Sequence, residues 1–130
     1  MKILFDTQLL VWAKSAPGRL PRQAAKALSD PSTLPIFSTI SIWELSIKHP
    51  LGRDDSRMVE PRRLRSALLE SGYEELDLTA QHALAVADLP RHHGDPFDRM
   101  LITQAKLEGL PFFSADRVLK KYGDPVRLVG

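Results

Sequence analysis

The sequence predicts an α/β domain with a mostly parallel, five-stranded sheet flanked by helices. Its 130 residues suffice for one domain but not for two. Short apolar runs alternate with longer amphipathic stretches, an order typical of strands and helices that follow one another along the chain. No repeat or low-complexity segment interrupts this order. We therefore expect residues 1–130 to form a single domain.

The first half of the chain is expected to hold two strands and three helices. The apolar run Ile3–Phe5 is typical of a buried strand, and the helix after it ends near the Pro17-Gly18 turn. Pro21 can open a second helix, which stops before Asp30-Pro31. A second strand over 35–38 leads directly into a helix that begins at Ser41. The longest loop follows, over residues 50–60.

The second half continues the alternation. Pro61 favours the start of a helix that Gly72 closes, and residues 73–78 alternate like a half-buried strand. Thr79 is a good N-cap for an alanine-rich helix over 80–88. A strong helix starts at Asp95 and ends at Gly109. The remaining elements are a strand at 112–113, a helix over 116–122 and a closing strand over 126–129.

Composition excludes several classes of protein. The chain has no cysteine, which rules out a disulfide scaffold, a thiolate zinc site and a cysteine nucleophile. No apolar run reaches the roughly 18 residues that a membrane span needs. The acidic residue Asp6 comes too early for a signal peptide. We therefore expect a cytoplasmic protein that does not enter a membrane.

The net charge is mildly basic. Eighteen Lys and Arg against sixteen Asp and Glu give a formal charge of +2, which permits a polyanionic partner without requiring one. The basic residues gather in three segments, which are Arg53 to Arg65, Arg91-His92-His93, and Arg117 to Lys121. Runs of this kind are more often a solvated face than a binding site.

Two acidic residues are placed where ligands bind in parallel sheets, beyond the carboxyl ends of the strands, and two more can join them there. Asp6 directly follows the first strand, and Asp116 follows the strand at 112–113 after two small residues. Glu44 lies in the first turn of the helix expected after the second strand and can therefore face the same edge. Asp98 joins them only if its own helix starts at that edge. The pattern predicts up to four carboxylates around one crevice.

Each of these acids also has a purely structural interpretation. Ser41-Ile42-Trp43-Glu44 fits a capping box, and Asp95 with Asp98 fits an acidic first helical turn. Asp6 and Asp116 can cap the turns that follow them. Capping explains each acid separately, but it does not explain why four of them share one edge of the sheet.

Carboxylates that converge repel one another unless a cation offsets their charge or one of them takes up a proton. A site made only of oxygen ligands suits Mg²⁺ or Mn²⁺. Such a site can activate water and stabilise the charge that develops on a phosphodiester during in-line attack. The four acids therefore favour metal-dependent phosphodiester chemistry.

Four segments of the chain resemble the PIN-domain toxins of the VapC type. They are residues 5–12 (FDTQLLVW), 42–48 (IWELSIK), 95–105 (DPFDRMLITQA) and 114–116 (SAD), of which the third is the most specific. The likeness runs in order from Lys2 to about Val129. It implies a single Rossmann-like PIN domain that acts as a metal-dependent endoribonuclease, the toxin of a type II toxin–antitoxin system.

The resemblance also implies a set of site residues. Asp6, Glu44, Asp98 and Asp116 are expected to be catalytic and to bind one or two Mg²⁺ or Mn²⁺ ions. Three residues are expected to assist them: Thr7 and Ser114 by orienting a carboxylate or a metal-bound water, and Asp95 mainly as an N-cap, with an outer-shell contact to the metal through water as its second role. One position departs from the family pattern, because Gln8 stands where many relatives have His and cannot titrate.

Three partners follow from the same resemblance. The first is an RNA substrate, cleaved to leave a 5′-phosphate and a 3′-hydroxyl. The second is a small VapB-like antitoxin whose tail occupies the acidic groove, and the third is a second copy of the chain in a homodimer. The residues expected to bind the RNA backbone are Lys48, Arg53, Arg62, Arg63 and Arg99.

Several of these residues have a second interpretation. Lys48 follows Glu44 by four residues, the spacing of a helical ion pair, and Arg99 also suits a solvated surface. Trp12 and Trp43 suit base stacking but are more typical of core positions in their apolar surroundings. His92 and His93 with Asp95 resemble a metal cluster, although their loop lacks a second ligand-bearing element.

Two other functions stay open on the sequence alone. A phosphoryl-accepting, receiver-like domain also places an Asp after a strand, but this chain lacks the second acid and the terminal lysine that such domains need. A non-catalytic α/β binding module, in which all four acids are caps, is the other alternative. Mn²⁺ binding measured by calorimetry separates the binding module from the nuclease.

Overall fold

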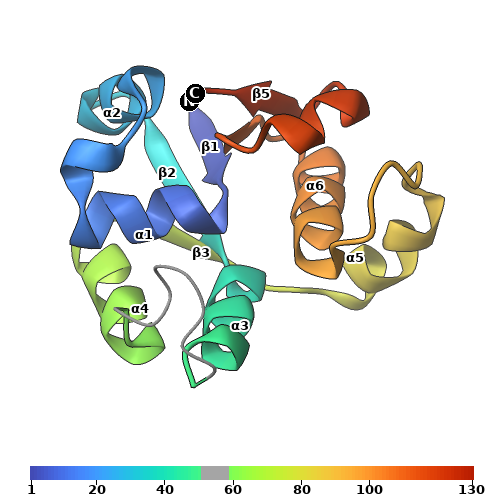
Figure 1. Ribbon diagram of the computed structural model, residues 1–130, viewed down its shortest axis with the longest axis horizontal. Helices are drawn as coiled ribbons and strands as arrows, with labels where there is room; N and C mark the ends of the chain where they lie inside the picture. Colours follow the sequence, from blue (N-terminus) through green and yellow to red (C-terminus); the bar gives the residue numbers. More distant parts are fainter. Residues whose placement is uncertain (51–58) are drawn as a thin grey trace.

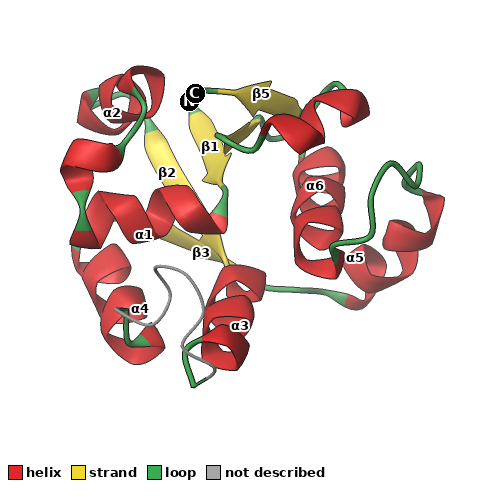
Figure 2. Ribbon diagram, viewed as in Figure 1, coloured by secondary structure: helices red, strands yellow, loops and turns green. Residues whose placement is uncertain are grey.

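The computed structural model describes residues 1–50 and 59–130, which form a five-stranded, all-parallel sheet with helices against both faces (Figures 1 and 2). The strands lie in the order β3-β2-β1-β4-β5. Their bounds are β1 Lys2–Phe5, β2 Leu34–Ser38, β3 Glu74–Leu76, β4 Phe112–Ser114 and β5 Val126–Leu128. The predicted α/β class and all five predicted strands are confirmed, and the sheet is entirely parallel.

Six α-helices lie within the described residues. They are α1 Thr7–Ser15, α2 Arg22–Ser29, α3 Thr39–Lys48, α4 Pro61–Glu70, α5 Ala80–Ala85 and α6 Pro96–Glu108. Short 3₁₀ helices add η1 Pro17–Arg19, η3 Val86–Asp88 and η4 Arg117–Tyr122. The helix predicted over 80–88 is therefore divided between α5 and η3, and the one predicted over 116–122 is a 3₁₀ helix. None of the helices in this part of the chain is long and apolar enough to cross a membrane.

Two hydrophobic cores, one on each face, bury the sheet. Side chains alternate between the faces along a strand, so that Ile3 and Phe5 belong to one core and Leu4 to the other. The first core packs the sheet against α1, α2 and α4 through Leu9, Leu10, Ala24, Leu64 and Leu68. The second packs it against α6 and η4 through Leu101, Ile102, Ala105 and Leu119. Because both faces are covered, the central strands β1, β2 and β4 are mostly apolar, whereas the edge strands β3 and β5 carry charged residues.

The start of α3 differs from the prediction. Ser38, at the end of β2, is the N-cap, and its Oγ accepts a hydrogen bond from the Ile40 backbone N–H at 3.0 Å. The helix therefore begins at Thr39, two residues before Ser41. The capping box proposed for Ser41 and Glu44 is wrong, because both residues lie within the helix.

The strand order creates a crevice beside β1. The chain proceeds from β1 to β2 and β3 on one side, and β4 and β5 lie on the other side. The connections that leave β1 and β4 thus diverge, and ligands of parallel sheets bind at such a switch point, beyond the carboxyl ends of the strands. In this protein that edge carries Asp6, Ser114 and Asp116.

Candidate metal centre

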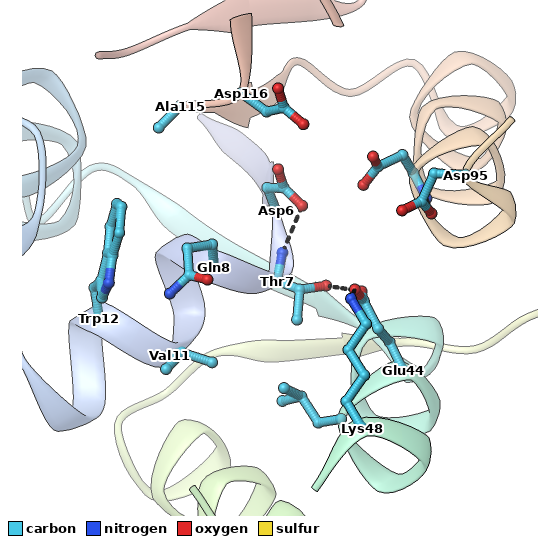
Figure 3. A pocket seen from close by; sticks show the side chains of 12 residues that line it. Asp6, Thr7, Gln8, Val11, Trp12, Glu44, Lys48, Asp95, Ala115 and Asp116 are labelled. Carbon is cyan, nitrogen blue, oxygen red and sulfur yellow. Dashed lines mark hydrogen bonds and ion pairs between the residues drawn. The ribbon is translucent and has the colours of Figure 1, made fainter. Parts of the chain in front are cut away.

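A pocket of about 330 Å³ lies at this edge, and several of its lining side chains are acidic. Five carboxylates line it together with Lys48, and the remaining lining residues are uncharged. Figure 3 shows Asp6, Asp95 and Asp116 pointing from three separate elements toward one space, with Glu44 beside them. The acids of the pocket are Asp6, Glu44, Asp95, Asp98 and Asp116. The structure therefore brings together all four acids that the sequence singled out.

Asp6 joins the end of β1 to the start of α1. It is the N-cap of α1, and its Oδ1 accepts a hydrogen bond from the Thr7 backbone N–H at 2.8 Å. Its Oδ2 accepts a second one from Ser114 Oγ, at the end of β4, at 2.6 Å. Only 7% of Asp6 is exposed. Neutral donors from two neighbouring strand ends thus fix both oxygens of this carboxylate.

Glu44 reaches the pocket from the second turn of α3. Thr7 Oγ donates a hydrogen bond to Glu44 Oε1 at 2.8 Å and lies 2.8 Å from Ser41 Oγ. Lys48, one turn along the same helix, donates from Nζ to Glu44 Oε2 at 2.5 Å. The ion pair expected from the spacing of Glu44 and Lys48 is therefore formed.

Asp95 and Asp98 enter the pocket from the beginning of α6. Asp95 is the N-cap, because its Oδ1 accepts hydrogen bonds from the backbone N–H groups of Phe97 and Asp98 at 2.9 and 3.0 Å. The carboxylate of Asp98 instead contacts His93 Nε2 at 3.2 Å. The N-cap role expected of Asp95 is confirmed, and the helix does start at the edge of the sheet where Asp98 meets the other acids.

Asp116 completes the pocket from the N-terminus of η4. Its Oδ1 accepts a hydrogen bond from the Val118 backbone N–H at 3.0 Å, so it caps this short helix. The Asp116 backbone N–H donates to Ser114 Oγ at 3.0 Å. Ser114, which is fully buried, therefore holds the backbone of one acid and the carboxylate of another.

The acids repel one another strongly. Burial, followed by the charge of Asp98, raises the pKa of Asp6 to about 7, although the hydrogen bond from Ser114 acts in the opposite direction. Burial, followed by the charges of Asp95, Glu44 and Asp116, raises the pKa of Asp98 to about 7. Burial of Lys48 favours its neutral form, but the hydrogen bond and charge of Glu44, together with the charges of Asp95 and Asp98, outweigh it and raise the pKa of Lys48. The pocket is thus a region of concentrated negative charge with one neighbouring ammonium group.

The fold is shared with proteins of known family. The PIN domain family matches this chain over residues 3–125. The chain belongs to the PIN domain family. Among curated protein sequences, none is similar enough to count as a relative.

Three solved structures that resemble this PIN domain are toxin–antitoxin complexes. VapBC2 from Rickettsia felis, bound to a DNA fragment from its promoter, has a TM-score of 0.71 at 15% identity, with 98% of this chain and 97% of that chain covered. A toxin–antitoxin complex from Klebsiella pneumoniae has a TM-score of 0.67 at 20% identity, with 98% of each chain covered. VapBC-5 from Mycobacterium tuberculosis has a TM-score of 0.58 at 17% identity, with 98% and 97% covered. Identities this low show the shared fold.

Arg99 was expected to contact RNA, but the structure buries it inside the domain. Only 6% of Arg99 is exposed, and its guanidinium donates hydrogen bonds to the carbonyl oxygens of Pro90 and Leu89 at 2.9 and 3.1 Å and to the Tyr122 hydroxyl at 3.1 Å. We therefore assign it a structural role, that of fastening the segment before α6. Arg62 and Arg63 are exposed on α4, as phosphate contacts require, whereas Arg53 lies outside the described residues.

Of the two tryptophans, only Trp12 lies where the sequence predicted it, and His93 makes contacts that were not predicted. Trp12 packs against the first core as predicted, but Trp43 is 57% exposed, so its expected core position is wrong. Trp43 lies edge-on to Phe97 with ring centroids 5.2 Å apart. His93 contacts Asp98 and the Tyr122 hydroxyl, which the sequence analysis did not foresee. The only available signal was the position of His93, five residues before Asp98.

Proposed function

We propose that this PIN domain is a metal-dependent endoribonuclease and the toxin of a type II toxin–antitoxin system. The observation that supports the proposal is the convergence of five carboxylates, from segments far apart in sequence, on one pocket at the switch point of the sheet. A binding module in which each acid only caps a helix does not require this convergence. Moreover, Glu44 and Asp98 make these hydrogen bonds with other side chains and not with the backbone N–H groups of a helix start, so capping does not account for them.

The residues of the pocket fit a hard divalent cation. The candidate ligands Asp6, Glu44, Asp98 and Asp116 all offer carboxylate oxygens, which suit Mg²⁺ or Mn²⁺. The raised pKa values of Asp6 and Asp98 express an excess of negative charge that a cation relieves. Within the described residues, no three Asp, Glu or His side chains are already arranged as a ligand set. Side-chain rotation on a fixed backbone is therefore part of the proposal.

In this proposal Asp6, Glu44, Asp98 and Asp116 hold the ion. When bound, Mg²⁺ or Mn²⁺ supplies an activated water and neutralises charge on the scissile phosphate. Thr7 and Ser114 orient the carboxylates of Glu44 and Asp6 through the hydrogen bonds described above. Asp95 holds the first turn of α6 in place, and with it Asp98. The products are a 5′-phosphate and a 3′-hydroxyl.

The rival phosphoryl-accepting function has less support. That chemistry uses a second acid close to the strand-end aspartate, where this chain has Thr7 and Gln8. Here the acids that approach Asp6 come instead from α3, α6 and the segment after β4. This distribution suits a cation shared between distant segments better than a phosphorylated aspartate.

RNA cleavage by the purified protein tests the proposal. We expect cleavage with Mg²⁺ or Mn²⁺ and none with EDTA, and a loss on the order of 100-fold or more in Asp6→Asn and Asp98→Asn. Asp88→Asn, which alters an exposed carboxylate outside the pocket, is the matched control and should keep its activity. Equal cleavage in EDTA would reject the metal-dependent mechanism. Full activity of both pocket variants would reject the residue assignment.

The partners follow from the same proposal. Arg62 and Arg63 supply exposed cations for the RNA backbone, together with the predicted contributions of Lys48 and Arg53. The carboxylate pocket suits a basic segment of a VapB-like antitoxin, because such a segment offsets the same charges as a metal ion. Mixing the protein with its antitoxin should therefore abolish both cleavage and Mn²⁺ binding.

A homodimer is the third proposed partner arrangement. Large apolar side chains are exposed on two helices that pack against α6, namely Trp43 and Ile47 on α3 and Leu84 on α5. Exposed apolar surface of this kind is typical of protein interfaces. Light scattering on the wild type and on Trp43→Ser should show a dimer that weakens in the variant.

A further inference from the structure

Lys48 is the one positively charged side chain among the described residues that line the carboxylate pocket. Its side chain is 29% exposed, and its Nζ donates to Glu44 Oε2 at 2.5 Å. The same Nζ lies 5.8 Å from the centroid of the Phe97 ring, in the first turn of α6. The ammonium is thus held between α3 and α6, at the edge of the acidic site (Figure 3).

We propose that Lys48 is an internal counter-cation, which holds Glu44 in the metal-free protein and leaves it when a divalent cation binds. The inference rests on the proposed metal-dependent function. It adds that metal loading is an exchange of one cation for another at Glu44, and that the affinity for metal is set partly by the strength of this ion pair.

The hydrogen-bond donors to the buried acids Asp6 and Glu44 differ in charge. Thr7 and Ser114 are neutral donors, and a carboxylate oxygen has more than one lone pair, so their hydrogen bonds are compatible with a metal ligand. Lys48 carries a full positive charge and repels a divalent ion in the same pocket. Of the donors to Asp6 and Glu44 described above, Lys48 is therefore the one that metal binding displaces.

The side chain of Lys48 is suited to this exchange. A lysine has a flexible four-carbon stem and a compact charge, so the ammonium can move several ångströms while its backbone stays in α3. Once it leaves Glu44, it remains beside the pocket and is available to a substrate phosphate. The two interpretations of Lys48 from the sequence, an ion pair and a phosphate contact, then describe two positions of one side chain.

Calorimetric titration with Mn²⁺ tests the exchange without reference to activity. We expect Lys48→Met to bind Mn²⁺ about tenfold more tightly than the wild type, a change of about 1.4 kcal/mol. Lys48→Arg, which keeps the charge, should stay within about threefold of the wild type. Lys106→Met removes a cation at the far end of α6, outside the pocket, and should leave the affinity unchanged. Thermal melts in EDTA check that each variant is folded.

The signal of the lysine ammonium group in a ¹⁵N-labelled sample tests the exchange directly. In the metal-free protein we expect a hydrogen-bonded Lys48 ammonium signal, assigned by its absence in Lys48→Met. Saturation with Mg²⁺ should shift this signal or broaden it through exchange with water. A signal that persists unchanged at saturating Mg²⁺ means that the ion pair survives metal binding, and it overturns the proposal.

The calorimetric outcomes separate this inference from the proposed function. Wild-type Mn²⁺ binding with an unchanged or weaker affinity in Lys48→Met overturns the role of Lys48 and leaves the metal-dependent nuclease standing. A wild type that binds no Mn²⁺ overturns both. Tighter binding in Lys48→Met, with wild-type affinity in Lys106→Met, supports the exchange.

Discussion

The charge of Asp98 should destabilise the metal-free protein above neutral pH, so its removal should stabilise the fold. Burial and the neighbouring acids raise the pKa of Asp98 from an ordinary value of 3.8 to about 7. A carboxyl group with a raised pKa binds its proton more tightly in the folded chain than in the unfolded chain. Stability is therefore lost as the pH rises from about 4 to about 7, and the loss is complete above that range.

The structure gives the size of this effect. One pKa unit corresponds to about 1.4 kcal/mol, so an isolated group shifted this far costs about 4 kcal/mol above pH 7 and about 2 kcal/mol at pH 5. The side chain of Asp98 is 14% exposed, so solvent screens little of this cost. Asp98→Asn keeps the shape of the side chain and removes the charge. We expect the gain in stability to be about 2 kcal/mol larger at pH 8 than at pH 5.

Urea denaturation in EDTA at pH 5 and pH 8 measures the difference. At pH 8 the variant should unfold at a higher urea concentration than the wild type, with an unchanged slope. Asp88→Asn, at an exposed position outside the pocket, should change neither midpoint by more than about 0.5 kcal/mol. A variant that is less stable than the wild type at pH 8, or equally stabilised at both pH values, would refute the reasoning.

Two further substitutions test the supporting residues. Arg99→Met leaves the carbonyl oxygens of Pro90 and Leu89 without their donor and should lower the free energy of unfolding by about 3 kcal/mol, while RNA binding by the folded protein at low temperature is unchanged. If the folded variant binds RNA more weakly than the wild type, Arg99 contacts the substrate and the structural role is not its only one. Ser114→Ala removes the hydrogen bond to Asp6 Oδ2 and should cost about 1–2 kcal/mol in EDTA, more at pH 8 than at pH 5, because that bond favours the charged form of Asp6. Urea midpoints at the two pH values give the comparison, and a loss independent of pH would show that Ser114 acts on Asp6 only through packing.

The strands could be predicted from the sequence because their physical signal is local. The central strands of a doubly covered sheet are short apolar runs, and Ile3–Phe5 or Phe112-Phe113 needs no distant information to stand out, whereas β3 had to be predicted from its alternating pattern. The start of α3 is harder to predict, because Ser38, Thr39 and Ser41 are all acceptable N-caps. Only the end of β2 decides that Ser38 takes the role.

The site was predictable to the extent that it follows the strand ends. Asp6 and Asp116 are fixed by this rule, whereas Asp98 is not, since α6 follows a loop and its starting point depends on tertiary packing. Arg99 is a second case in which the sequence did not determine where a side chain points. It follows Asp98 directly, but one step along a helix is a rotation of about 100°, which turns it away from the pocket and toward the carbonyl oxygens before α6.

Capping and metal binding are not competing explanations for Asp6 and Asp116. A helix that starts where a parallel strand ends places its N-cap at the crevice, so the same carboxylate is available for the proposed metal site. Glu44 and Asp98 differ, because their hydrogen bonds go to Thr7, Lys48 and His93 rather than to the amides of a helix start. In a buried pocket of like charge these two acids add repulsion that capping does not offset. A divalent cation bound in the pocket would offset this repulsion, and that is the physical argument behind the proposed metal site.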